Sequence, residues 1–216
     1  MYKTIIFDLD GTLLDTLDDL TDSVNAALRK YGYKTRTKED VRGFIGNGII
    51  KLIERALGEK IADFELVLQE FKTYYGAHCA DKTQPYEGVM ALLQVLREKG
   101  IKTAVLSNKA DFAVKTLAKT YFGDLLMTAV GEDEAAGIHK KPAPDALFAV
   151  MKELGARKET TVYIGDSEVD IQTAQNAGIA CISVTWGFKD KAFLLQNGAK
   201  ILVDEPLELL SVCGVV

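Results

Sequence analysis

The sequence has little cysteine and no long hydrophobic run. Its three cysteines, Cys79, Cys181 and Cys213, are odd in number and far apart, so they fit neither a disulfide framework nor a metal-ligand spacing. Free thiols are typical of a reducing compartment. No apolar run approaches the length that spans a bilayer, and the N-terminal segment, unlike a secretory signal, reaches Asp8 after only three apolar residues. We therefore expect a cytoplasmic protein.

The chain also lacks an excess of basic residues. Its 26 Lys and Arg residues are outnumbered by 31 Asp and Glu residues, which gives a formal net charge of -5. Broad binding to nucleic acid or to an anionic membrane needs a basic surface, so we expect neither partner. A small phosphorylated metabolite held in a local pocket stays compatible with this composition. The 216 residues are enough for a core domain and a small accessory domain, and we expect a monomer or a weak homodimer.

The hydrophobic pattern changes character twice along the chain. Residues 4–7 form a short apolar, β-branched run that predicts a buried strand ending at Asp8. From about residue 16, helical periodicity replaces this signal, and it predicts a four-helix insert in which Thr37 caps one helix. The apolar residues that define the helical faces are Leu17, Leu20, Val24, Leu28, Ile49, Ile53, Leu57, Ile61, Phe64, Leu68, Phe71 and Tyr75.

After the insert, expected strands and helices alternate to the end of the chain. The strands are expected at residues 103–107, 125–130, 161–164, 181–184 and 201–203. Strands separated by helices predict an α/β fold with a doubly wound, Rossmann-like parallel sheet. The predicted domains are a core made of residues 1–15 and 82–216, and a helical domain made of residues 16–81. Such sheets bind ligands beyond the carboxyl ends of their strands.

Polar side chains follow several of these expected strands. The first strand leads into Asp8-Leu9-Asp10-Gly11-Thr12, and the second ends in Ser107-Asn108. The strand at 161–164 leads into Gly165-Asp166-Ser167, with Asp170 one helical turn later. Because these ends meet at one edge of a parallel sheet, the sequence predicts a single polar site there.

Carboxylates at such an edge are suited to phosphoryl transfer. Asp8 and Asp166 can supply the oxygen ligands that Mg²⁺ prefers. A carboxylate can also attack phosphorus and form an aspartyl-phosphate. Asp10 can reach the same centre and manage the leaving-group proton, provided that the chain turns there, and Gly11 permits such a turn.

The transferring phosphoryl group also needs positive charge and hydrogen-bond donors. The segment Lys140-Lys141-Pro142 offers two lysines, and the Ser107 hydroxyl offers a hydrogen bond. Thr12 and Asn108 stand beside these groups and are candidates for substrate binding.

These segments resemble, in chain order, the four motifs of the haloacid dehalogenase superfamily, whose phosphotransferase branch carries Asp-x-Asp-Gly-Thr. The helical insert stands where this superfamily places its type 1 cap. The resemblance implies that Asp8 is the nucleophile and Asp10 the general acid/base. It implies Mg²⁺ bound by Asp8, the Asp10 backbone carbonyl and Asp166, with Asp170 supporting the metal. It also favours Lys141, directly before the proline, as the phosphoryl-binding lysine.

Three further segments look like the phosphoglycolate phosphatase branch: Asp15-Thr16, Ile45-Gly46-Asn47-Gly48, and Val184 to Phe188. Members of that branch tend to carry Gly-x-Gly at this cap position, and a proline is common where this chain has Leu17. Gly46, Asn47 and Gly48 are expected to bind an anionic group of the substrate at a helix N-terminus. The alternative is that these glycines only form the turn that starts a helix.

The favoured function is hydrolysis of a small phosphate monoester, with phosphoglycolate as the best single substrate. Alternatives with the same machinery are a pyrophosphatase, another small-molecule phosphatase and a phosphosugar mutase. A phosphonoacetaldehyde hydrolase needs a cap lysine, a role for which Lys51 is available. A non-catalytic regulator that binds a phosphorylated ligand is the alternative outside enzymes.

Overall fold

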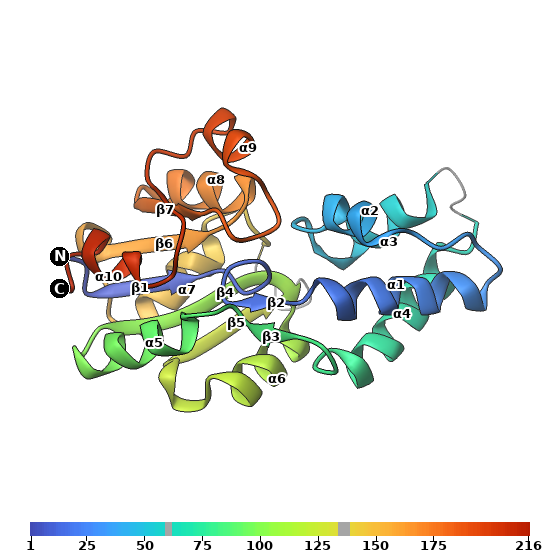
Figure 1. Ribbon diagram of the computed structural model, residues 1–216, viewed down its shortest axis with the longest axis horizontal. Coiled ribbons are helices and arrows are strands. Elements are labelled where there is room, and N and C mark those ends of the chain that lie inside the picture. Colours follow the sequence, from blue (N-terminus) through green and yellow to red (C-terminus); the bar gives the residue numbers. More distant parts are fainter. Residues whose placement is uncertain (59–61, 134–138) are drawn as a thin grey trace. The chain divides into compact units, whose positions relative to one another are not determined.

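The computed structural model describes residues 1–58, 62–133 and 139–216 (Figure 1). The chain forms two compact units, one of residues 1–14 and 85–216 and the other of residues 15–84. Two short paired strands, β2 (Leu14–Asp15) and β3 (Gln84–Pro85), lie where the chain passes between the units. Ile61, predicted to line a helical face, lies outside the described residues. No helix within these ranges is long and apolar enough to cross a membrane.

Six strands of the described chain form one parallel sheet in the order β5-β4-β1-β6-β7-β8. They are β1 (Thr4–Phe7), β4 (Lys102–Ala110), β5 (Thr128–Glu132), β6 (Thr161–Gly165), β7 (Ala180–Val184) and β8 (Leu202–Val203). The central strand β1 pairs with β4 on one side and with β6 on the other, so the strand order switches at β1. The predicted doubly wound α/β fold is confirmed, and its ligand-binding crevice is expected at the end of β1.

The largest differences from the predicted strand boundaries are at the end of β4 and at the start of β5. β4 runs on to Ala110, past the Ser107 at which we expected it to end. The polar residues at this end continue the strand through a register shift between Leu106 and Ala110. The strand expected at 125–130 begins only at Thr128, because residues 123–125 form a short 3₁₀ turn. Helix α10 (Glu208–Val212) was not predicted.

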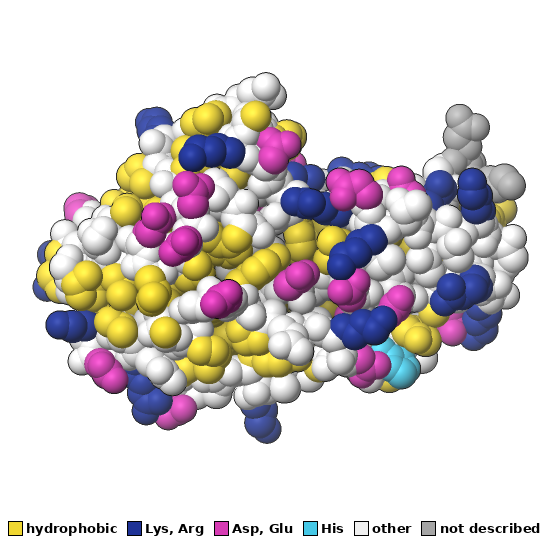
Figure 2. Space-filling view, in the orientation of Figure 1, with side chains coloured by type: hydrophobic (Ala, Val, Ile, Leu, Met, Phe, Trp, Pro, Cys, Tyr) yellow, Lys and Arg dark blue, Asp and Glu magenta, His cyan; other side chains and the backbone are white. Residues whose placement is uncertain are grey.

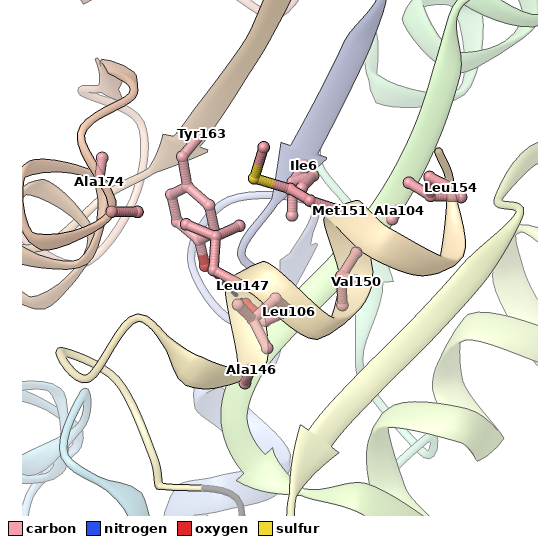
Figure 3. Close-up of a cluster of buried hydrophobic side chains, with 11 residues drawn as sticks. Ile6, Ala104, Leu106, Ala146, Leu147, Val150, Met151, Leu154, Tyr163 and Ala174 are labelled. Carbon is pink, nitrogen blue, oxygen red and sulfur yellow. Dashed lines mark hydrogen bonds between the residues drawn. The ribbon is translucent and has the colours of Figure 1, made fainter. Parts of the chain in front are cut away.

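Four helices of the described chain pack against the sheet and create its core: α5 (Val89–Glu98), α6 (Asp111–Tyr121), α7 (Asp145–Glu153) and α8 (Glu168–Ala177). Helix α9 (Lys191–Gln196) lies between β7 and β8 in the sequence, and α10 packs against α5. In Figure 3, Ile6 of β1, Leu106 of β4 and Tyr163 of β6 contribute to one buried cluster with Leu147 and Met151 of α7. Burying each large apolar side chain contributes about 1.5–3 kcal/mol. This packing fixes the spacing of the neighbouring strand ends.

The second unit contains four helices among its described residues: α1 (Leu17–Lys30), α2 (Lys38–Phe44), α3 (Gly48–Leu57) and α4 (Phe64–His78). The predicted cap at Thr37 is confirmed. Its hydroxyl accepts a hydrogen bond from the Asp40 N–H (3.1 Å), and the Asp40 carboxylate accepts one from the Thr37 N–H (2.9 Å). Such a reciprocal pair satisfies backbone donors that the first turn of a helix leaves open.

A buried carboxylate joins α1 to the end of this unit. Asp19 accepts hydrogen bonds from the backbone N–H of Lys82 (3.0 Å) and from the backbone N–H and hydroxyl of Thr83 (both 2.8 Å). Periodicity did not indicate this role, because an aspartate in the first turn of a helix is expected to face solvent. The segment that leaves the four-helix unit is therefore attached to the helix that enters it.

Candidate active site

The Asp8 carboxylate lies directly after the central strand and is buried. Its Oδ1 accepts a hydrogen bond from the Leu9 N–H (2.7 Å) and lies 3.1 Å from Nζ of Lys141. The Ser107 hydroxyl of β4 also hydrogen-bonds to Asp8. Three residues predicted from separate segments are thus brought together at one strand end.

Lys141 is held from both its side chain and its backbone. Its Nζ donates to Oδ1 of Asp170 (2.7 Å) and to the hydroxyl of Tyr163 (2.9 Å), and that hydroxyl donates to the Leu106 carbonyl (2.6 Å). The side-chain amide of Asn108 donates to the Lys141 carbonyl (2.9 Å) and accepts from the Lys141 N–H (2.8 Å). The side chain of Asn108, predicted to bind substrate, therefore fixes the backbone of Lys141 through hydrogen bonds to its N–H and its carbonyl.

Asp170 links this lysine to the start of α8. Its Oδ2 accepts hydrogen bonds from the Ser167 N–H (3.1 Å) and the Ser167 hydroxyl (2.6 Å), while Oδ1 faces Lys141. A carboxylate used on both oxygens has a fixed orientation, so Asp170 positions the Lys141 ammonium.

Asp166 completes an acidic cluster. One carboxylate oxygen each from Asp8, Asp166 and Asp170 lies within 4.8 Å of the others, and all three residues are buried. The Asp166 Oδ2 accepts a hydrogen bond from the Phe188 N–H (2.7 Å). Gly11 has φ +80°, and a Cβ there would lie 2.3 Å from the same Oδ2. Only glycine therefore permits the predicted turn after Asp10.

The electrostatics of this cluster favour a bound cation. Burial raises the pKa of Asp8 to about 6, with Lys141 opposing the rise and Asp170 and Asp10 adding to it. Burial also raises the pKa of Asp166 well above its ordinary value, and Asp170 and Asp8 add to this rise. Burial alone would lower the pKa of Lys141, but Asp170 and Asp8 raise it well above the usual range. Crowded carboxylates with oxygen donors are suited to a hard divalent ion.

A second buried lysine contacts Asp10. The Nζ of Lys109 lies 2.8 Å from Oδ1 and 3.1 Å from Oδ2 of Asp10, and the lysine side chain is only 3% exposed. Sequence reasoning missed Lys109. A signal existed, because residues two apart in an extended strand share a face and Ser107 was already a candidate.

Thr12 is buried beside the turn that follows Asp10. Its carbonyl accepts a hydrogen bond from Nε1 of Trp186 (3.0 Å). Among the described residues its hydroxyl has no hydrogen-bond partner. A buried hydroxyl is normally paired, so this group is compatible with the predicted contact to a ligand.

The predicted residues Gly46, Asn47 and Gly48 belong to the four-helix unit, where they lie between the end of α2 and the first residue of α3. Gly46 has φ +116° and Gly48 has φ +82°, conformations that favour glycine. Arg55 holds this loop, since its guanidinium donates to the Phe44 carbonyl and to Oδ1 of Asn47 (both 2.7 Å). Sequence reasoning missed Arg55, which looks like an ordinary charge on an exposed helical face.

A parallel α/β sheet with carboxylates, a hydroxyl and a buried lysine at the end of its central strand defines an enzyme built for phosphoryl chemistry. Comparison with known proteins agrees, since the family model of the haloacid dehalogenase-like hydrolases matches residues 5–184. This chain belongs to that family.

Individual relatives match almost the whole chain. The phosphoglycolate phosphatase of Pseudomonas syringae pv. syringae (strain B728a) is 33% identical, over 98% of this chain and 79% of the relative. That of Haemophilus influenzae is 32% identical, over 98% of each protein. The crystal structure of a protein from Lactobacillus delbrueckii subsp. bulgaricus, described as a phosphoglycolate phosphatase, superposes with a TM-score of 0.93. It is 38% identical to this chain and covers 98% of each chain. The match thus includes both compact units.

Proposed function

We propose that this protein is a Mg²⁺-dependent phosphatase that hydrolyses phosphoglycolate to glycolate and phosphate. The observation that carries this proposal is the pairing at the end of β1, where the Lys141 ammonium lies 3.1 Å from the buried Asp8 carboxylate. A nucleophilic carboxylate beside a cation is what attack on an anionic phosphate requires. Relatives named phosphoglycolate phosphatase support the choice of substrate.

The residues of the site fit a Mg²⁺ ion, because the donors gathered there are oxygens from buried carboxylates. Asp8, Asp166 and the backbone carbonyl of Asp10 would hold the ion, and Asp170 would support it. Bound Mg²⁺ supplies positive charge that offsets the repulsion between the substrate phosphate and the acidic cluster.

The chain's own residues then divide the chemistry between them. A carboxylate oxygen of Asp8 forms a bond to phosphorus, and the bond from phosphorus to the ester oxygen breaks. Asp10 donates a proton to the departing ester oxygen, which leaves as an alcohol. Lys141 and Ser107 bind the phosphoryl oxygens through charge and a hydrogen bond. A water molecule then attacks the aspartyl-phosphate, Asp10 accepts its proton, and phosphate leaves with Asp8 restored.

A panel of small phosphate compounds assayed with Mg²⁺ tests this proposal. Suitable members are phosphoglycolate, ethyl phosphate, a hexose phosphate, inorganic pyrophosphate and phosphonoacetaldehyde. We expect the highest kcat/KM for phosphoglycolate. A higher value for pyrophosphate or phosphonoacetaldehyde, or hydrolysis of none of them, would contradict the proposal.

Asp166→Asn should weaken metal binding. Mg²⁺ should raise the melting temperature of the wild-type protein, since a ligand at 100 times its Kd stabilises the native state by about 2.7 kcal/mol. In Asp166→Asn this increase should shrink, and activity should recover partly at high Mg²⁺. Without metal the variant should melt no lower than wild type, because the raised pKa of Asp166 means that its ionised form opposes folding at neutral pH.

Asp124→Asn is the matched control for Asp166→Asn, since it makes the same chemical change at an exposed ion pair with Arg97. It should keep the full Mg²⁺-dependent rise in melting temperature. Full wild-type activity in the presence of a strong chelator would rule out the metal-dependent mechanism.

The loop at Gly46–Gly48 is proposed to hold the substrate carboxylate through backbone N–H groups at the start of α3. Gly48→Val should raise the KM for phosphoglycolate at least about tenfold, a factor that corresponds to 1.4 kcal/mol, because the side chain disturbs a backbone with φ +82°. A neutral aryl phosphate has no carboxylate, so its KM should change little. Steady-state kinetics on both substrates measures the difference.

Gly43→Ala provides a control in the same unit. Gly43 lies within α2, and a Cβ there would meet nothing within 4 Å, so its kinetics should match wild type. Equal losses on both substrates in Gly48→Val would mean that the loop only shapes its unit. Unchanged phosphoglycolate kinetics would remove the loop from the site.

A further inference from the structure

The core unit has a buried ammonium, that of Lys109, beside the proposed acid/base Asp10, and the proposed reaction steps do not involve it. We infer that Lys109 binds the carboxylate of the leaving group and so selects phosphate esters of small hydroxy acids. This inference rests on the proposed function, in which Asp10 protonates the ester oxygen. It gives the substrate carboxylate a partner in the core unit, in addition to the backbone N–H groups proposed for the loop at Gly46–Gly48.

The position of Lys109 follows from its contact with Asp10. Both Asp10 oxygens lie within 3.1 Å of the Lys109 Nζ. In the reaction, an Asp10 oxygen must reach the ester oxygen within hydrogen-bonding distance. In phosphoglycolate a single methylene separates that ester oxygen from the carboxylate. A substrate placed for proton transfer from Asp10 therefore has its carboxylate within reach of the Lys109 ammonium, and rotation about the methylene bonds allows the two groups to meet.

Charge gives a reason for a lysine at this place. A substrate carboxylate beside Asp10 would put two negative groups together in a buried environment, where repulsion is stronger than in water. An ammonium group carries three N–H donors, which is enough to bridge two carboxylates with charge-assisted hydrogen bonds. An ester with a neutral leaving group gains nothing from this bridge.

The neighbouring lysines have other contacts. Lys141 bonds to Asp170 and lies against Asp8, on the side where the phosphoryl group binds. Lys140 lies 3.7 Å from the carboxylate of Glu132. Of these three lysines of the core unit, Lys109 is the one whose ammonium contacts Asp10, the residue proposed to protonate the leaving group.

The backbone around Lys109 is fixed, which suits a residue that must discriminate. Here β4 shifts its register against β5 between Leu106 and Ala110. A Cβ on Gly131 of β5 would lie 2.6 Å from the Lys109 carbonyl, so the two strands approach as only glycine allows. Irregular pairing of this kind commonly re-aims a side chain next to an active site.

Lys109→Met tests the inference, because it keeps much of the side-chain length and removes the charge. Phosphoglycolate and ethyl phosphate are compared, since both are esters of poor alkoxide leaving groups and differ by the carboxylate. We expect the kcat/KM for phosphoglycolate, divided by that for ethyl phosphate, to fall at least about tenfold, because the site loses the group that binds the substrate carboxylate. Lys140→Met is the matched control and should keep the wild-type ratio.

Binding to an inactive protein separates recognition from proton transfer. In an Asp8→Asn background, Lys109→Met should weaken the affinity for phosphoglycolate and leave that for ethyl phosphate unchanged, as measured by calorimetry. Equal losses of kcat/KM on both esters would show that Lys109 only positions Asp10, and would overturn the inference. An unchanged ratio would also overturn it. If the wild-type enzyme does not hydrolyse phosphoglycolate, the proposed function itself fails, and the two failures are distinct.

Discussion

Asp8→Asn is expected to abolish turnover while the protein stays folded. An amide cannot attack phosphorus to give the aspartyl-phosphate, so the loss should reach at least four orders of magnitude, in keeping with the roughly 10⁶-fold loss when a protease loses its nucleophile. The fold should survive. Burial raises the pKa of Asp8, so ionising this carboxylate in the folded protein costs free energy, and the neutral asparagine side chain avoids that cost. Phosphate release from phosphoglycolate and circular dichroism measure the two effects.

Two experiments accompany this variant. Asp204→Asn makes the same change at an exposed aspartate that directly follows another strand of the sheet, β8, and it should leave turnover unchanged. Beryllium trifluoride, a mimic of the phosphoryl group, should bind the Asp8 carboxylate of the wild-type protein and raise its melting temperature, but it should not do so in Asp8→Asn. A folded Asp8→Asn protein with readily measured activity would exclude Asp8 as the nucleophile.

The ends of the strands could be predicted because their signals are local. A short apolar run that stops at Asp8, and another that stops before Asp166, place both residues at one edge of a parallel sheet. The signal for Thr37 as the N-terminal capping residue of α2 was also local, since its partner Asp40 is three residues away.

Contacts between distant segments could not be predicted in the same way. Tyr163 looks like any aromatic residue of a buried strand, yet its hydroxyl accepts from Lys141 and donates to Leu106. Which partner a buried hydroxyl finds depends on packing across three strands and a loop. Asp19 and Arg55 were missed for the same reason, because each bonds to a backbone that periodicity does not place beside it.

The net charge of the chain does not describe how charged side chains are distributed over the surface and the site. Figure 2 shows Lys and Arg side chains interspersed with Asp and Glu on the visible face. An acidic net charge therefore says little about the site, where buried lysines accompany buried carboxylates. Such pairs are costly to desolvate, and they persist where chemistry requires them.

Lys141→Ala is expected to lower kcat/KM by about 10²–10³, the cost of removing a donor from the charge that develops in a transition state. Stability should fall as well, by about 3–5 kcal/mol, because the change leaves the buried Asp8 and Asp170 without the ammonium between them. Kinetics must therefore be measured below the melting transition, and added Mg²⁺ should restore part of the stability by offsetting the negative charge that the lysine no longer balances.

Lys140→Ala separates this role from mere proximity to the site. Lys140 is the adjacent residue and carries the same charge, but it faces Glu132 at 3.7 Å and its side chain is 30% exposed. A partly exposed ion pair contributes about 0–1 kcal/mol, so both activity and melting temperature should stay near wild type. The opposite ranking of the two variants would assign the phosphoryl contact to Lys140. Equal losses in both would mean that the loop acts through its conformation, and that the network of Lys141, Asp170 and Tyr163 serves stability alone.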